Sequence, residues 1–148
     1  MKKSEIAVTI ALLGLVMYTL ALSALGTVQT NRMISNAGTV KAIGVGVYSD
    51  SECTSPLSSI DWGTLEPGTT KDVTCYVKNE GNSASVLSME TSNWSPPSVS
   101  DYMTLSWDYT GQPLNPDEVV EVTFTLTVSP SIDGITSFSF DIVIVGSG

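Results

Sequence analysis

Two patterns of hydrophobic and polar positions divide this chain of 148 residues. Between Glu5 and Arg32 no residue is charged, and the apolar stretch 6–28 has roughly the length of a helix that crosses the ~30 Å hydrocarbon core of a bilayer. We therefore expect an N-terminal apolar α-helix. The basic pair Lys2-Lys3 ahead of it favours a cytoplasmic N-terminus, which places everything after about Gly26 outside the membrane.

From Val40 onward the period changes to two residues. Segments 123–128, 137–144 and 73–78 alternate apolar with polar side chains, although 137–144 becomes apolar on both faces at its end. Such alternation is typical of half-buried antiparallel strands. Further strands are expected at 41–48, 58–62, 83–90 and 102–109.

Turn clusters separate these segments, and about seven short strands in roughly a hundred residues is the count expected of an immunoglobulin-like sandwich. The sequence therefore predicts a mainly β protein in two parts. Residues 1–35 form a leader and apolar helix, and residues 36–148 form an antiparallel β-sandwich of about seven strands.

One short pattern occurs twice. Leu65-Glu66-Pro67-Gly68 and Leu114-Asn115-Pro116-Asp117 each precede a Val-Thr pair at the same offset. A proline turn that fixes φ and leads into a strand of set register explains the spacing. Both segments resemble the turn-strand signature of immunoglobulin-like domains common on prokaryotic surface proteins, which supports the fold and not a function.

The net charge of −9 limits the partners of the predicted sandwich. Beyond Ala42 only Lys71 and Lys78 oppose a long series of acidic residues. Because such a surface repels phosphate backbones, we expect no nucleic-acid partner, and binding to anionic lipid is disfavoured too. The acidity is best explained as keeping an exposed domain soluble.

The two cysteines, Cys53 and Cys75, both lie in the part of the chain expected outside the membrane. There a pair is more often a disulfide than a metal site. The bond would close a loop of about twenty residues and stabilise the fold by ~3 kcal/mol. In the alternative, Cys75 is a small buried hydrophobe and Cys53 a free thiol in a loop.

Missing residue types argue against an enzyme. The chain contains no histidine, which removes the common nucleophilic triads and most zinc sites. Carboxylates alone can hydrolyse glycosides, but a small sandwich offers little cleft for such a pair. Asp50 and Glu52, with Asp61, could supply oxygen ligands to calcium, yet their spacing matches no specific calcium loop. We expect no catalytic residues, no metal and no cofactor.

The three tryptophans are more readily explained as core residues than as binding residues. Trp107 lies in a strand pattern and Trp62 ends one, so both are expected in or over the core. Trp94 is the most exposed of the three in this interpretation, and so the best suited to a partner surface. Asn93 begins the triplet Asn-Trp-Ser and is a candidate N-glycosylation acceptor.

Three interpretations of the N-terminus stay open. Small residues near Ala21 and Ala24 suit a cleaved secretory signal, and the apolar stretch also suits an uncleaved anchor. In the third, the short basic leader Met1-Lys2-Lys3-Ser4 precedes Glu5 and a long apolar helix. This arrangement resembles archaeal type IV pilins and related archaellum components. The resemblance implies a helix that is first a membrane anchor and later the filament core, with a β-sandwich head.

The resemblance implies a structural subunit of a surface filament whose partners are copies of itself. The chain would be inserted in the membrane before assembly. The helix residues expected to pack between subunits are Glu5, Ile6, Leu12, Gly14, Leu15, Met17, Tyr18 and Leu22. After cleavage at Ser4 or earlier, Glu5 would offset the N-terminal amine of a neighbouring subunit.

Two other modes of action remain from the same residues. Cleavage near Gly26 would leave residues 27–48 as an extended strand, which could complete the sheet of a neighbouring subunit. Alternatively, an uncleaved helix would anchor a binding module that docks on an envelope or surface-layer protein. All three place the domain at the cell surface or outside the cell.

Overall fold

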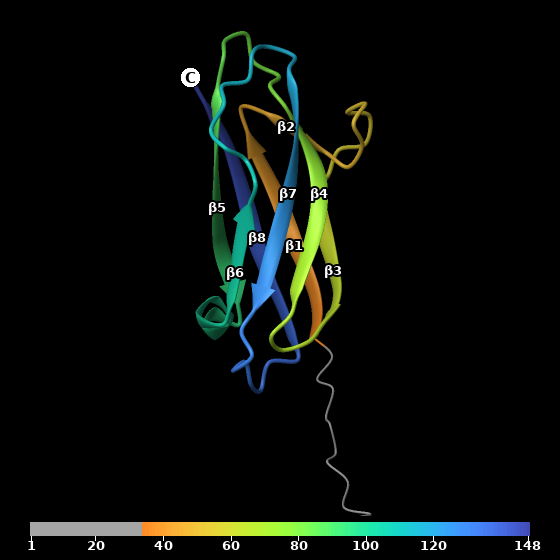
Figure 1. Cartoon of the computed structure of the whole chain (residues 1–148), viewed down its shortest axis with the longest axis vertical. Helices are drawn as coiled ribbons and strands as arrows, with labels where there is room; N and C mark the ends of the chain where they lie inside the picture. Colours follow the sequence, from red (N-terminus) through yellow and green to blue (C-terminus); the bar gives the residue numbers. More distant parts are fainter. Residues whose placement is uncertain (1–33) are drawn as a thin grey trace, which may run out of the picture. The chain divides into compact units, whose positions relative to one another are not determined.

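The computed structural model describes residues 34–148, with side chains from Ala37 onward. Eight strands form two sheets of four, and the sheets face each other across one hydrophobic core (Figure 1). The expected sandwich is therefore present. The expected apolar helix and the leader lie outside the described residues. Within the described part, no helix has the length and apolar character needed to cross a membrane.

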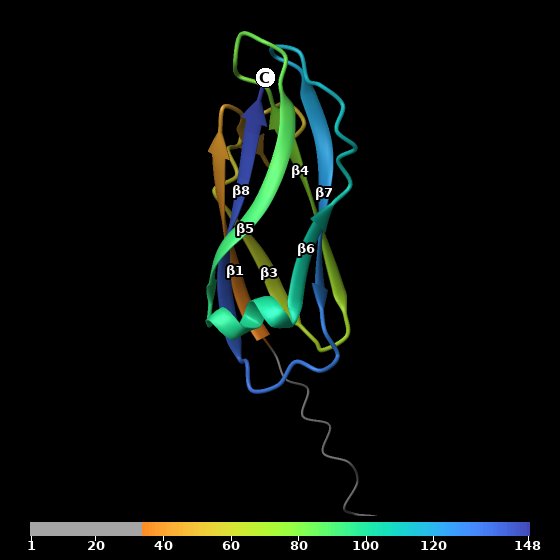
Figure 2. The ribbon, with the colours of Figure 1, turned by 90° about the vertical axis from the view of Figure 1, so that its left-hand side faces the viewer.

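The first sheet contains, in spatial order, β3 (Ser59–Leu65), β1 (Ile34–Ile43), β8 (Ser137–Ser147) and β5 (Val86–Ser95). The second contains β2 (Gly46–Tyr48), β4 (Thr70–Lys78), β7 (Val119–Val128) and β6 (Met103–Trp107). A short 3₁₀ helix, η1 (Pro97–Asp101), joins β5 to β6 at one end of the sandwich (Figure 2).

One pair of strands departs from the antiparallel rule. β1 runs parallel to β8, from Ser35 opposite Ser137 to Ile43 opposite Val145, while the other neighbouring strands are antiparallel. Both strands therefore run toward the same end of the sandwich, the upper end of Figure 1. β1 also pairs with β3 on its other side, so it is an interior strand.

The expected single strand 41–48 is two strands in different sheets. It breaks after Ile43, at Gly44 and Val45. Gly44 has φ +75°, and a Cβ there would lie 3.0 Å from the carbonyl oxygen of Gly146. Val45 is buried. The left-handed residue thus turns the chain out of the first sheet and into the second, which gives eight strands instead of about seven.

The period-two pattern correctly predicted which side chains face the core. Along β7, Val122, Phe124, Leu126 and Val128 are buried, and the residues between them face outward. Trp62 is fully buried, as expected of a core residue. Burying side chains of this size contributes roughly 1.5–3 kcal/mol each.

The repeated proline turns have the same backbone in both places. Thr69 N donates to Glu66 O and Glu118 N donates to Asn115 O, so each turn closes over four residues. The third residues of these turns, Gly68 and Asp117, have φ +77° and +66°. Proline second and a positive φ third match a type II turn. The common spacing predicted a proline turn at both places, without its type.

Candidate functional site

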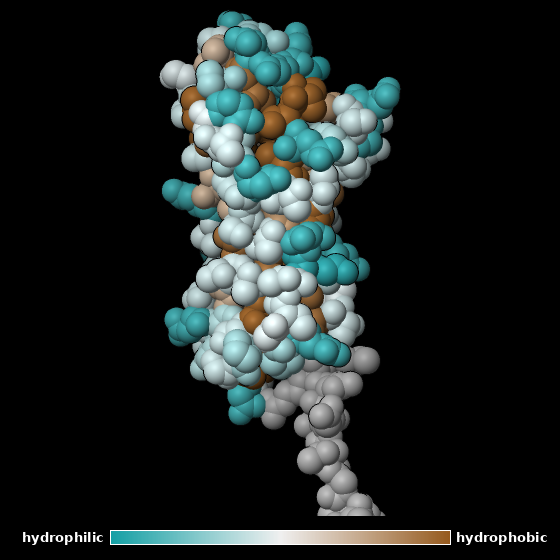
Figure 3. Space-filling view, in the orientation of Figure 1, coloured by the Kyte–Doolittle hydropathy of each residue, from teal (hydrophilic) through white to brown (hydrophobic). Residues whose placement is uncertain are grey.

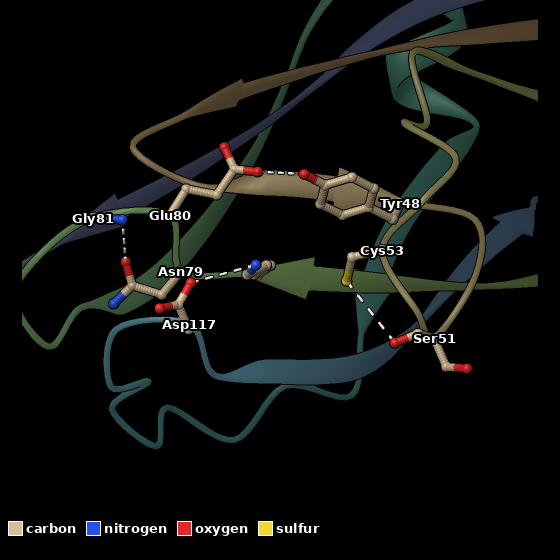
Figure 4. A network of polar contacts seen from close by, with 8 residues as sticks. Tyr48, Ser51, Cys53, Asn79, Glu80, Gly81 and Asp117 are labelled. Atoms are coloured by element: carbon tan, nitrogen blue, oxygen red, sulfur yellow. Dashed lines mark hydrogen bonds and ion pairs between the residues drawn. The ribbon is translucent and has the colours of Figure 1, made fainter.

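A network of polar contacts lies at the upper end of the sandwich, where three loops meet (Figure 4). Asn79, only 1% exposed, lies at their centre. Its Nδ2 donates to the carbonyl oxygens of Ser83 (2.8 Å) and Leu114 (2.9 Å), and its Oδ1 accepts from Gly81 N at 2.9 Å. One buried amide thus holds the 79–85 loop against the loop that precedes β7. The sequence marked this segment as a turn but gave no sign that Asn79 is buried.

Around Asn79 the charged groups are exposed. The Tyr48 hydroxyl donates to the Glu80 carboxylate, and this hydrogen bond raises the pKa of Tyr48. Lys78 and Asp117 form an ion pair at 3.3 Å in which the Asp117 side chain is 86% exposed. An ion pair this exposed contributes little to stability. These groups shape the surface of the upper end without forming a buried reactive centre.

The loop between β2 and β3 is organised by Asp50. Its carboxylate accepts hydrogen bonds from Thr54 N, Thr54 Oγ1 and Ser55 N, at 2.7–3.1 Å. These bonds, the one from the Thr54 side chain foremost, lower the pKa of Asp50. The Asp50 carboxylate, considered above as a calcium ligand, therefore accepts hydrogen bonds from its own loop. In residues 34–148 no three acidic or cysteine side chains gather in a way that could hold a metal ion.

The expected disulfide between Cys53 and Cys75 is not formed, and both residues are free thiols. Cys75 points inward from β4 and is fully buried, whereas Cys53 lies on the loop outside the core, with its Sγ 4.0 Å from Ser51 O. The two side chains therefore lie in different environments, as the alternative interpretation had it. Desolvation raises the pKa of Cys75 to about 12 and also raises that of Cys53.

Trp94 is less exposed than the sequence suggested. Its ring stacks on Phe140, with 4.1 Å between centroids, and it packs against the core from the end of β5. Trp107 is half-buried and stacks on Phe124. The tryptophans therefore extend the core toward the edge strands, so Trp94 is not a free binding platform.

Asn93, the candidate glycosylation acceptor, is exposed and takes part in a polar group on the first sheet. Its Nδ2 donates to Asp141 Oδ2 at 2.6 Å, and Lys41 Nζ lies 2.6 Å from the same oxygen. The hydrogen bond from Lys41, and next the one from Asn93, lower the pKa of Asp141. The sequence did not point to this group, because its members lie on three strands.

The outer face of the second sheet carries pale, weakly polar side chains among scattered hydrophilic ones (Figure 3). Pale residues cover its lower part, and brown side chains gather near the upper end. Its outward positions on β4, β6 and β7 include Thr70, Thr74, Thr104, Thr125 and Thr127. β-branched residues of this kind suit an exposed strand.

The residues expected to pack between subunits lie outside the described residues. This applies to Glu5, Ile6, Leu12, Gly14, Leu15, Met17, Tyr18 and Leu22. In the described domain, the polar groups that the fold brings together are amides, carboxylates and hydroxyls that hydrogen-bond to one another or to the backbone. These contacts order the loops and the sheet surface.

Comparison with known proteins adds little. No family model and no curated protein matches this chain. Among solved structures it is similar to the ASH/PapD-like domain of human CEP192, PapD-like domain 7, with 10% sequence identity and a TM-score of 0.40. The match covers 71% of this chain and 85% of that chain.

Proposed function

We propose that this chain is a structural, non-enzymatic protein of the cell surface, and more narrowly a pilin-like subunit of an extracellular filament. In this proposal the apolar stretch 6–28 first holds the subunit in the membrane and later packs in the filament core. The sandwich then forms the outer surface. The observation that carries the proposal is how the chain enters the sandwich, through an interior strand of a sheet.

β1 is well placed to transmit tension from an N-terminal helix. It forms nine residue pairs with β8 and six with β3. A pull on the chain ahead of Ile34 acts along these ladders, so their hydrogen bonds resist together. A sandwich entered through an edge strand would instead have one ladder to resist the load. Attachment through an interior strand thus suits a subunit that must stay folded while held by its N-terminal segment.

The same pairing bears on the strand-exchange alternative. Residues 34–43, part of the segment expected to leave for a neighbour, already have partners on both sides in their own sheet. Donating these residues to a neighbouring subunit would break the hydrogen-bond ladders of β1 with β3 and with β8. This supports assembly through the apolar helix over assembly through exchanged strands.

A membrane-anchored binding module remains the second candidate. The layout of an apolar segment followed by an acidic, histidine-free sandwich suits it equally. In that case the upper end, where Asn79 joins the 79–85 loop to the loop that precedes β7, would be the surface to dock on an envelope protein.

The mature N-terminus and the form of the product distinguish these proposals. We expect mass spectrometry to give Glu5 as the first residue, and electron microscopy of cells expressing the tagged chain to show filaments that bind the tag antibody. Met1 as the terminus with a membrane-bound pool alone would favour the anchored module. A terminus between Ala24 and Val28 would favour the strand-exchanging subunit.

A matched pair of variants tests the role of Glu5. Glu5→Ala is expected to abolish filaments while leaving the subunit in the membrane, because the neighbouring amine would lose its counter-charge in a low-dielectric core. Thr9→Ala, nearby on the same segment, should leave filaments intact. Filaments from Glu5→Ala at the normal level would contradict the proposed packing.

A further inference from the structure

The outer face of the first sheet carries an apolar patch at the upper end of β8. Of the three large hydrophobic side chains that are exposed in the described residues, Ile43 (57%) and Val86 (41%) lie on this face. Val143 and Val145 lie between them on β8 and point outward, since Phe140, Ile142 and Ile144 point into the core. We call Ile43, Val86, Val143 and Val145 the β8 patch.

Charges of opposite sign flank this patch. Lys41 on β1 and Glu90 on β5 both pair with Val143, from opposite sides of β8. The Lys41 side chain is 54% exposed even though it contacts Asp141. Glu90 is exposed and makes no ion pair within residues 34–148. Across the sheet at Val143, the row therefore reads positive, apolar, negative, and Asp141, the partner of Lys41, is the outward residue before Val143 on β8.

This row is complementary to itself. A two-fold axis parallel to β8 that passes above Val143 would place Lys41 of one copy over Glu90 of the other, twice, with the two Val143 side chains between the pairs. An axis across the strands would instead set Lys41 against Lys41. Face-to-face packing of sheets at about 10 Å with nearly aligned strands is an ordinary arrangement.

We propose that the β8 patch binds the β8 patch of a second copy of this chain, with the two sheets packed face to face and the strands of both copies pointing the same way. The proposal rests on the proposed function in taking another copy as the partner and a shared membrane as the setting. Residues 34–148 hold fourteen acidic residues against three lysines, so two such domains repel each other over most orientations. The row through Val143 is a place where contact brings opposite charges together. The parallel orientation also leaves both chains entering their sandwiches at the same end, as a shared membrane requires.

Crosslinking of the full-length chain in its membrane tests the contact. Val143→Cys in a Cys53→Ser background is treated with a bismaleimide of about 10 Å reach, the expected spacing of packed sheets. Cys75 is fully buried and should not react. The matched control is Val119→Cys, because Val119 is 38% exposed on the outer face of the other sheet. We expect a crosslinked dimer from Val143→Cys and none from Val119→Cys. No dimer from Val143→Cys, or equal dimer from both, overturns the proposal.

Charge exchange supplies the second readout. Lys41→Glu and Glu90→Lys should each lower the crosslinking yield of Val143→Cys roughly tenfold, since each turns two attractive pairs into repulsive ones. The double variant Lys41→Glu/Glu90→Lys should restore the yield. If Lys41→Glu misfolds through loss of its Asp141 contact, Glu90→Lys alone still decides, because Glu90 makes no such contact with the described residues. An unchanged yield in Glu90→Lys overturns the proposal. Filaments without the crosslink would refute this contact alone, and the crosslink without filaments would refute the filament alone.

Discussion

Trp94 stacks on Phe140, with ring centroids 4.1 Å apart and planes 10° from parallel. Phe140 points inward from β8, and Trp94 stands near the end of the edge strand β5. The stack therefore fastens an edge strand to a central one at the end of the sandwich where η1 lies. It continues on the other side of Phe140 to Trp62, at 6.3 Å between centroids.

Replacing Trp94 should loosen this end of the sandwich. Trp94→Ala is expected to lower the free energy of unfolding by roughly 3 kcal/mol, because it removes a large half-buried ring and leaves a cavity. Trp94→Phe keeps a stacking ring and should cost clearly less. Urea unfolding of the full-length chain, followed by fluorescence, measures both. Equal small losses in the two variants would show that the stack contributes little.

The strands could be predicted because the alternation of apolar and polar residues is visible along a single strand, without knowledge of its neighbours in the sheet. β4, β7 and β8 repeat apolar and polar residues over enough positions to reveal their inward faces. The first half of β1 lacks this signal, since it contains Ala37 and Gly38 among polar residues. Gly38 is needed because a Cβ there would lie 3.0 Å from Trp62 Nε1, a contact between distant segments that no local pattern records.

The polar groups were harder to predict for a related reason. Lys41, Asn93 and Asp141 lie on three strands and meet only after the sheet has formed. The disulfide prediction was wrong because it rested on the number of cysteines and their expected place outside the membrane, whereas Cys75 faces the core and Cys53 lies on a loop outside it. The parallel pairing of β1 with β8 likewise joins the first and last strands of the domain, which lie about a hundred residues apart, so no local pattern records it.

Asn79 should be the most sensitive polar residue at the upper end. Asn79→Ala removes one of the two donors to the Leu114 carbonyl, which keeps its bond from Ser85 N, and leaves the Gly81 N–H without its partner. The change should cost roughly 1–2 kcal/mol of unfolding free energy. Asn82→Ala, in the same loop but exposed, should change stability by less than about 0.5 kcal/mol. Denaturant unfolding compares them, and equal effects would mean that the loop tolerates loss of its central amide.

The two proline turns offer a comparison within one chain. Gly68→Ala should cost roughly 1–2 kcal/mol, because alanine must adopt φ +77°. Asp117→Gly at the matching position should cost less than about 0.5 kcal/mol, because glycine suits φ +66° and the exposed ion pair to Lys78 contributes little. Thermal unfolding of both variants provides the measurement. A larger loss for Asp117→Gly would show that its carboxylate, not its backbone, is what matters.

The two thiols should differ in reactivity. At neutral pH, maleimide should label Cys53 in the folded protein and leave Cys75 unlabelled until denaturant is added, because burial holds the Cys75 pKa near 12 and blocks access. Mass spectrometry counts the labels, and Cys53→Ser serves as the control that should take none while folded. A protein that takes no label even when unfolded would contain the disulfide after all.

Acid should remove the stabilisation that Asp50 gives to its loop. Because hydrogen bonds from Thr54 and Ser55 lower the pKa of Asp50 in the folded state, the carboxylate stabilises the fold above its unfolded pKa near 4, and this stabilisation is lost as the pH falls through the lower, folded-state value. Asp50→Ala should therefore be less stable than the natural chain at pH 6, and the difference should shrink below pH 4. Glu52→Ala is the matched control, since Glu52 is an exposed acid in the same loop with no hydrogen bond among the described residues. Urea unfolding at a series of pH values gives the comparison, and a difference between Asp50→Ala and the natural chain that does not change with pH would contradict this role.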